Sequence, residues 1–204
     1  MNQRSKQTHQ SPKVRADEWR VFCAIELPGP VRSLVLRHIA RLQEVVPQAR
    51  ASWARDTTLH LTLKFLGEIP QGSVSDFSNA VSLAVAAVAP FSIRLNNNGV
   101  FPNQRQARVL WLGVDDLSGQ LLELHARLEA AAEKVGFAKE ARGFRPHLTI
   151  ARLRHPDDAR ELAVIHQQLE FEPVDIAVKE LAVIRSELSS AGSKYTVVSR
   201  HSLK

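Results

Sequence analysis

The sequence His60-Leu61-Thr62-Leu63 returns almost unchanged as His147-Leu148-Thr149-Ile150, 87 positions further along a chain of 204 residues. Both copies lie in stretches whose apolar residues alternate, which is typical of β-strands. Because successive side chains of a strand point to opposite faces, each histidine shares a face with the threonine two positions later. The repeat therefore predicts two strands that each present an imidazole and a hydroxyl together on one face.

Strict alternation also assigns the opposite, apolar face of each strand. It predicts that Leu61, Leu63 and Phe65 are buried in the first copy, and Leu148 and Ile150 in the second. Of the eight histidines, only these two precede a hydroxyl residue at the second position and a branched aliphatic residue at the third. A single copy would be explained by a hydrogen-bonded strand residue, whereas two copies indicate a duplicated functional unit.

The duplication extends to the flanking sequence. The apolar stretch 20–25 matches the stretch 108–113 at an offset of 88, and each is followed by an amphipathic helical pattern and then by a motif strand. We therefore predict an α+β fold of two pseudo-symmetric β-α-β-α-β lobes, with antiparallel-leaning sheets that flank a central cleft. The expected strands are 20–25, 59–66, 91–95, 108–113, the second motif, 175–186 and 194–199, the last pairing with 180–187 in a hairpin; the expected helices are 31–42, 72–88, 121–132 and 156–169.

Domain organisation follows from composition. Residues 1–17 hold almost no large apolar side chain and are predicted to form a disordered basic tail, with residues 18–204 forming a single bilobal domain. No apolar run approaches the roughly 18 residues of a membrane span, and no signal-peptide core is present. The only cysteine, Cys23, cannot form an intrachain disulfide and lies in an apolar strand. These features predict a cytoplasmic monomer and no role for Cys23 as a nucleophile.

The formal charge of +6 and the sequence pI of about 9.9 favour a polyanionic partner. Residues 1–17 carry four positive side chains and one negative side chain, Asp17. Part of the excess charge therefore belongs to this segment, and the folded part is only mildly basic. This suits transient capture of phosphate more than the wrapping of a duplex, which needs many phosphate contacts. A basic surface that only aids solubility is the alternative.

Two histidines in one cleft can act as a proton-transfer pair, because imidazole titrates near neutral pH and one ring can be the base while the other is the acid. Threonine hydroxyls between them can donate hydrogen bonds to charged oxygens. Attack on phosphorus requires this set of groups. We expect no metal and no cofactor, because neither motif carries further ligands at metal-binding spacing; zinc or manganese remains an alternative.

At these residues the chain resembles the two-histidine (2H) phosphoesterase superfamily, which carries paired H-x-[ST]-hydrophobic motifs in pseudo-symmetric lobes. More closely, residues 19 to 203 resemble the bacterial and archaeal RNA 2′,3′-cyclic phosphodiesterases, once called 2′-5′ RNA ligases. The resemblance implies an enzyme that opens an RNA-terminal 2′,3′-cyclic phosphate to a 2′-phosphomonoester without a metal, and that in some members joins 2′-5′ linkages in reverse. The segments that carry it are 20–28, Trp53, 60–67, 108–111, 144–152, 186–188, Gly192 and Tyr195.

The resemblance also implies roles for single residues. His60 resembles the proton donor to the departing 3′-oxygen and His147 the proton acceptor that activates water, although pseudo-symmetry leaves this order open in the sequence. Thr62 and Thr149 match hydroxyls that hold the phosphate. Arg152 matches an arginine near the phosphate, but strict alternation from His147 turns it away from the cleft unless the strand ends or bulges there.

Other assignments stay open. Phe22 and Phe144 are candidates to stack on a base, with burial in the core as the alternative. The expected partner is RNA with a 2′,3′-cyclic phosphate end, or a cyclic nucleotide. A non-catalytic module that binds RNA ends is the competing hypothesis, and a 2H enzyme that acts on a small nucleotide or on an ADP-ribose cyclic phosphate is a third.

Overall fold

The structure is a computed structural model that describes residues 17–154, 156–189 and 192–204. The predicted disordered tail lies outside these residues, apart from Asp17, whose carbonyl accepts a hydrogen bond from the Gln71 amide at 2.9 Å. The helices and strands are β1 (Glu18–Glu26), α1 (Gly29–Val45), β2 (Ala51–Trp53), β3 (His60–Pro70), α2 (Val74–Val85), β4 (Phe91–Phe101), β5 (Val109–Asp115), α3 (Gln120–Lys134), β6 (His147–Leu153), α4 (Pro156–Gln168), β7 (Val174–Val178), β8 (Glu180–Ser189) and β9 (Gly192–Ser202).

The α+β class is confirmed. Four helices accompany two antiparallel sheets, which have the strand orders β3-β1-β8-β9 and β2-β6-β5-β4-β7. The expected C-terminal hairpin is present, because β8 pairs with β9. Each motif strand lies next to the strand that opens its own half of the chain, so β3 pairs with β1 and β6 pairs with β5.

The two halves exchange strands, which the sequence-based topology did not foresee. Strand β4 from the first half pairs with β5 and so belongs to the second sheet, while β8 and β9 from the second half complete the first sheet. The predicted single strand 175–186 is wrong for this reason. The chain changes sheets at Lys179, so that β7 pairs with β4 and β8 pairs with β1.

Two details of strand length also differ from the expectation. Strand β4 runs six residues past its expected end at Leu95, with Asn97 in the left-handed region at φ 58° where its pairing with β5 shifts. The short strand β2 was not expected, and it covers the outer edge of β6. Three consecutive asparagines, with the irregular Asn97 in the middle, hide the second half of β4 from any search for alternating apolar residues.

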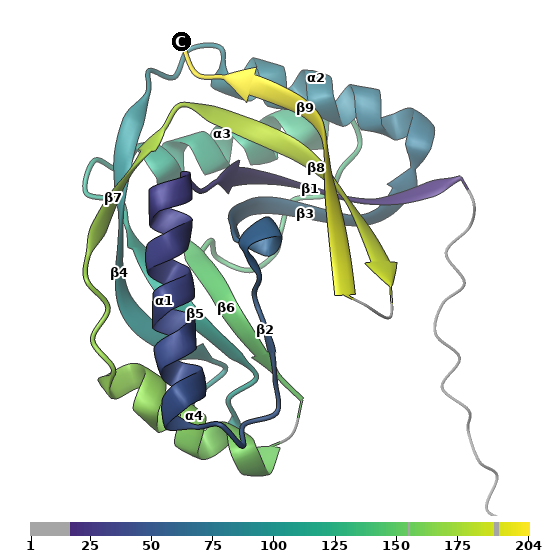
Figure 1. The fold of residues 1–204 in the computed structure, drawn as a ribbon. Helices are drawn as coiled ribbons and strands as arrows, with labels where there is room; N and C mark the ends of the chain where they lie inside the picture. The colour runs from purple at the N-terminus through teal and green to yellow at the C-terminus, as the bar shows by residue number, and fades with distance from the viewer. Residues whose placement is uncertain (1–16, 155, 190–191) are drawn as a thin grey trace, which may run out of the picture.

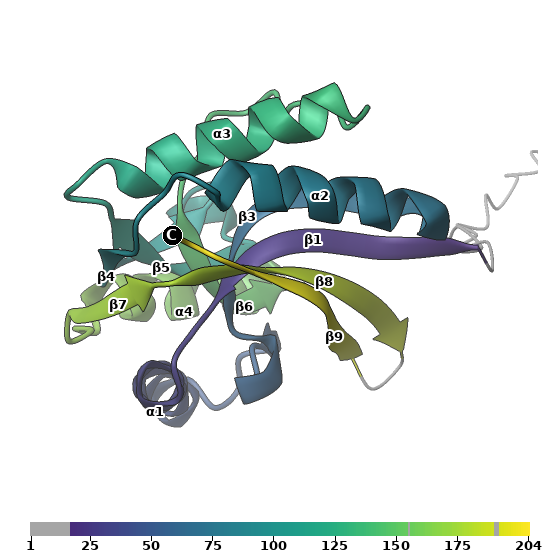
Figure 2. The same ribbon diagram turned by 90° about the horizontal axis from the view of Figure 1, so that it is seen from above.

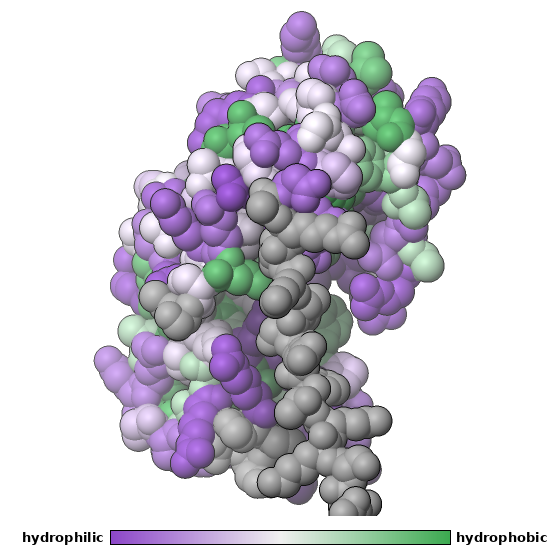
Figure 3. Space-filling view, turned by 90° about the vertical axis from the view of Figure 1, so that its right-hand side faces the viewer, coloured by the Kyte–Doolittle hydropathy of each residue, from purple (hydrophilic) through white to green (hydrophobic). Residues whose placement is uncertain are grey.

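The helices pack on the outer sides of the sheets (Figure 1). Helices α2 and α3 lie side by side against one face of the first sheet, and α1 lies on the other side of the molecule, where it meets α4 (Figure 2). The main cluster of buried apolar residues draws on both sheets and on all four helices. The face in Figure 3 is largely hydrophilic, with only small groups of hydrophobic residues. Among the described residues, no helix is long and apolar enough to cross a membrane.

Helices α1 and α4 meet through two buried histidines. His38 Nε2 lies 3.5 Å from His166 Nδ1, and His166 Nε2 lies 3.0 Å from the backbone carbonyl of Trp111. His38 is 3% exposed, and its own Nδ1 has no hydrogen-bond partner among the described residues. The pKa of His38 is lowered to about 4, chiefly by burial, and the charges of the nearby His166 and Arg41 contribute to this shift in the same direction.

This burial predicts a specific loss of stability in acid. His38 has a pKa near 6.5 in the unfolded chain and about 4 in the folded protein, so protons bind the unfolded chain preferentially. Above pH 6.5, His38 is neutral in both states and costs no stability through protonation. As the pH falls from 6.5 towards 4, protonation of the unfolded chain lowers the free energy of unfolding, and this loss is about 2 kcal/mol at pH 5. The variant His38→Leu should therefore show a smaller drop in the free energy of unfolding between pH 7.5 and pH 5, as measured by urea denaturation. Equal drops in the two proteins would contradict this account.

Candidate active site

The first motif lies on β3 and faces away from the core. Along β3, His60 and Thr62 are half-buried, whereas Leu61 and Leu63 are almost completely buried. Their neighbours across β1 are Glu26 opposite His60 and Ala24 opposite Thr62. Cross-strand neighbours share a face of the sheet, so these side chains line one surface.

The alternation of β3 breaks just after the motif. Leu63 and Lys64 are both buried, and Leu63 has no partner in the pairing with β1, which shifts by one residue between Thr62 and Lys64. A bulge of this kind turns the rest of a strand over. Phe65 consequently lies on the face of His60 and Thr62, with 50% of its side chain exposed. Its predicted burial was wrong.

The second motif strand has the same irregularity. Ile150 and Ala151 of β6 are both buried, and Ile150 has no partner in the pairing with β5. Arg152 is therefore exposed on the face of His147 and Thr149. This is the bulge that Arg152 needed in order to reach the cleft, and it makes Arg152 the counterpart of Phe65 in the other lobe.

His60 sits in an aromatic corner. Its ring stacks on Phe22 with centroids 4.6 Å apart and meets Tyr195 edge-on at 5.2 Å. Its Nδ1 is buried and has no hydrogen-bond partner of good geometry among the described residues. The pKa of His60 is lowered to about 4, chiefly by burial; the backbone of Thr58 raises it in part, and the charge of Arg152 lowers it.

His147 is held in a different way. Its Nδ1 lies 2.7 Å from the carbonyl oxygen of Arg145, which fixes Nδ1 as the protonated nitrogen of the neutral ring and leaves Nε2 with a free lone pair. Phe101 meets the ring edge-on at 5.0 Å. Burial lowers the pKa of His147, the Arg145 carbonyl raises it in part, and Arg152 lowers it again.

Arg152 links the two motifs. Its positive charge lowers the pKa of both His60 and His147, so one guanidinium lies within electrostatic reach of both rings. Strands β3 and β6, which carry the two motifs, are in contact. The hydroxyls of Thr62 and Thr149 make no hydrogen bond to any other residue that the structure describes. Arg152 is therefore the one side chain that acts electrostatically on the histidines of both motifs among the residues that the structure describes.

The proposed stacking residues have protein partners. Phe22 is 3% exposed and stacks on His60, while the Phe144 ring stacks on His125 with centroids 3.8 Å apart and an interplanar angle of 7°. Both positions favour a structural role. Phe65, with the Arg20 guanidinium 4.5 Å from its ring centre, is the exposed aromatic residue of this face instead. The sequence did not reveal the exposure of Phe65, because the bulge that causes it leaves the alternation of apolar residues in the sequence unchanged.

A further aromatic residue packs near His147 from the neighbouring strand β5. Trp111 lies 6.3 Å from His147 between ring centroids and 5.1 Å from Phe101. Its indole covers Gly99 on the neighbouring strand, where an added Cβ would lie 2.0 Å from the ring. Glycine at this position therefore leaves room for the indole to lie over the neighbouring strand β4.

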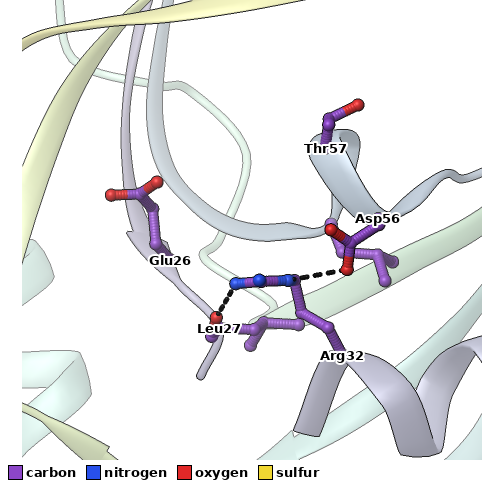
Figure 4. A pocket seen from close by; sticks show the side chains of 6 residues that line it. Glu26, Leu27, Arg32, Asp56 and Thr57 are labelled. Carbon is purple, nitrogen blue, oxygen red and sulfur yellow. Dashed lines mark hydrogen bonds and ion pairs between the residues drawn. The ribbon is translucent and has the colours of Figure 1, made fainter. Parts of the chain in front are cut away.

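A pocket opens beside the first motif (Figure 4). Arg32 crosses it, donating to Asp56 Oδ1 at 2.8 Å and to the Leu27 carbonyl at 2.7 Å. Because Glu26 lies opposite His60 in the β1–β3 pairing, this pocket borders the histidine. Its lining consists of Glu26, Leu27, Arg32, Asp56, Thr57 and Leu59.

The remaining side chains with metal-binding or nucleophilic chemistry do not form a second centre in the described part of the chain. Within those ranges, no three His, Cys, Asp or Glu side chains gather in a way that could hold a metal ion. Cys23 is buried in β1, and burial raises the pKa of its thiol. A thiol in this state is a poor nucleophile.

Known proteins are similar to this chain in sequence and fold. The family model described as the 2′-5′ RNA ligase superfamily matches residues 30–189. The chain belongs to this superfamily. A protein of Methanothermobacter thermautotrophicus named RNA 2′,3′-cyclic phosphodiesterase is 34% identical over 180 residues, which cover 87% of this chain and 95% of that protein. A protein of the same name from Thermus thermophilus is 32% identical over 192 residues and covers 91% of this chain and 90% of its own.

Solved structures agree with the sequence relatives. Escherichia coli LigT complexed with 3′-AMP superposes with a TM-score of 0.72 at 26% identity, covering 92% of this chain and 99% of that one. The structure of LigT complexed with phosphate gives a TM-score of 0.69 at the same identity and covers 93% and 99%. The two-lobed arrangement of this superfamily member is thus that of a solved nucleotide-binding and phosphate-binding protein.

The shared guanidinium gives a direct prediction. Replacing Arg152 with glutamine removes a positive charge that disfavours protonation of both rings, so the pKa values of His60 and His147 should both rise. NMR titration of the histidine ring protons would measure them, with His38 and His166 as internal controls because Arg152 does not act on them. A rise in only one of the two motif histidines would mean that Arg152 does not lie between them.

Proposed function

We propose that this chain hydrolyses the 2′,3′-cyclic phosphate at an RNA end to a 2′-phosphomonoester, with His60 and His147 as the acid–base pair. The observation that supports this most strongly is that each motif strand presents its histidine and threonine on one face, and that the bulge of β6 adds Arg152 to that face. The relatives named RNA 2′,3′-cyclic phosphodiesterase cover most of this chain. Cytoplasmic location and a monomeric state stay predictions.

The mechanism assigns each proton. The free Nε2 of His147 takes a proton from water as the water oxygen bonds to phosphorus, and the bond from phosphorus to the 3′-oxygen breaks. Protonated His60 gives its proton to the departing 3′-oxygen, so the phosphate stays on the 2′-oxygen. Thr62, Thr149 and Arg152 hold the non-bridging oxygens as their charge grows in the transition state. With a 5′-hydroxyl in place of water, the same steps would form a 2′-5′ linkage: His147 takes the proton of the attacking hydroxyl and His60 protonates the departing 3′-oxygen.

The experiment that tests this uses an oligonucleotide with a 2′,3′-cyclic phosphate end, in the presence of EDTA. A 2′-phosphate product is expected, and His60→Ala and His147→Ala should each lower turnover by about 10²- to 10⁴-fold. Thr62→Ala and Thr149→Ala should lower it less, because each removes one donor of a shared set. Arg94→Gln, at an exposed ion pair with Asp175, is the matched control.

Several outcomes would contradict the proposal. Near-normal hydrolysis by either histidine variant would exclude the two-histidine mechanism. Activity that is lost in EDTA and restored by a divalent ion would favour a metal. Binding of the RNA end that survives loss of both imidazoles, without turnover in the unmodified protein, would favour the non-catalytic binding module.

Unpaired arginines next to Arg152 favour an RNA substrate over a small nucleotide. Arg108 and Arg154 are both exposed, and neither forms an ion pair with any residue in the described part of the chain. Val109 pairs with Arg152, and the Arg108 carbonyl accepts a hydrogen bond from the Leu153 amide at 2.9 Å. These charges therefore continue from the phosphate site along the end of β5 and β6, where the chain upstream of the cyclic phosphate can meet them.

Substrate length tests this part of the proposal. Arg108→Gln and Arg154→Gln should leave kcat/KM for a cyclic mononucleotide within about twofold, but should lower kcat/KM for an oligonucleotide at low salt. The salt dependence for the oligonucleotide should also become shallower, by about 0.7 in the log–log slope for each phosphate that the variant no longer neutralises. Arg94→Gln again serves as the control. If the two substrates respond equally, the small-nucleotide hypothesis becomes the better one.

A further inference from the structure

A buried ion pair ties the first motif strand to helix α3. Because of the bulge, Lys64 points into the core, where its Nζ lies 2.9 Å and 2.8 Å from the two carboxylate oxygens of Glu129. The two side chains are 3% and 9% exposed. Buried ion pairs can often be replaced by apolar residues without loss of stability, so stability alone does not account for this pair.

The pair also holds the loop 135–146, which connects α3 to the second motif. Lys64 Nζ donates to the Ala138 carbonyl at 2.9 Å, and Glu129 accepts a hydrogen bond from the Glu140 amide at 3.0 Å. Further along the loop, Phe144 stacks on His125, which lies one helical turn before Glu129 on α3. Helix α3 therefore fixes this loop at two points.

The loop 135–146 leads directly into His147, the proposed proton acceptor. Arg145 directly follows Phe144, and its carbonyl oxygen holds the Nδ1 of His147 at 2.7 Å. A neutral imidazole carries its proton on either nitrogen, and the partner of one nitrogen decides which form is present. Only the form with Nδ1 protonated has a lone pair on Nε2 to accept a proton from water.

We propose that Lys64 and Glu129 are positioning residues, which hold the loop 135–146 so that the Arg145 carbonyl keeps His147 in its proton-accepting form. The arrangement exists in one lobe only, because the position of Lys64 is taken in β6 by Ala151, which is 1% exposed. Lys64 stands two residues after Thr62 on β3, so the same contact connects the first motif strand to the histidine of the second. The activity part of this proposal rests on the proposed function; the state of the His147 ring does not.

The test compares single and double substitutions at the pair. Lys64→Met or Glu129→Leu alone leaves a buried charge without its partner and should lower the melting temperature. The double variant Lys64→Met/Glu129→Leu should regain much of that melting temperature. Its kcat should nevertheless be lower than that of the unmodified protein by about 10- to 100-fold, with a smaller change in KM, because the base is misplaced. Arg127→Gln, at an exposed ion pair on the same helix, should change none of these quantities.

A second readout separates positioning from stability. The ¹⁵N shifts of the histidine rings report which nitrogen carries the proton, and they are measured without substrate at a pH where His147 is neutral. In the double variant, His147 should change from the Nδ1-protonated form to a mixture, whereas the ring of His166, held by the Trp111 carbonyl, should not change. A mixture in a protein that lacks the proposed activity would still support the positioning role, so the two proposals can fail separately.

Clear results would overturn this inference. A double variant that recovers stability and also keeps normal kcat and the Nδ1-protonated His147 would show that the pair is merely structural. Should the double variant fail to fold, Phe144→Leu decides, because Phe144 is only half-buried and anchors the same loop to His125. An unchanged His147 ring in that variant would equally exclude the loop as its positioning device.

Discussion

The active face depends on a local failure of strand alternation. In both motif strands two consecutive residues, Leu63 with Lys64 and Ile150 with Ala151, are buried, although neighbouring residues of a regular strand point to opposite sides. The bulge moves the residue that follows onto the polar face. Without it, the site would hold two imidazoles and two hydroxyls but no cation, and the charge on a bound phosphate would have no formal counter-charge from Arg152.

Local patterns predicted the parts of the fold that depend on local rules. The faces of His60, Thr62, His147 and Thr149 follow from the two-residue period, and the helices follow from their apolar stripes. The burial predicted for Phe65 was wrong, because a bulge depends on the register with a neighbouring strand and leaves no trace in the alternation itself. The exchange of strands between the sheets escaped prediction for the same reason: the partners of β4 and β8 are set by long-range packing.

The two lobes are symmetric in their motifs but not in what supports them. Behind the first bulge, Lys64 reaches Glu129, whereas behind the second the small Ala151 simply fills the core. In front of the bulges, the equivalent positions hold Phe65 in one lobe and Arg152 in the other. A duplicated frame with different residues at equivalent positions can give two chemically identical histidines different tasks, because the environment of a histidine sets its protonation.

This difference bears on how the acid becomes charged. His147 has a fixed tautomer and a free Nε2, which suits a base, while burial and Arg152 hold the pKa of His60 to about 4, so His60 is neutral in the free protein at pH 7. An acid must be protonated first. A bound phosphate brings negative charge next to His60 and at the same time offsets the positive charge of Arg152, and both effects raise the pKa of His60. In the proposed mechanism, substrate binding would therefore protonate His60, the proposed acid, and Arg152 would make that change depend on the presence of phosphate.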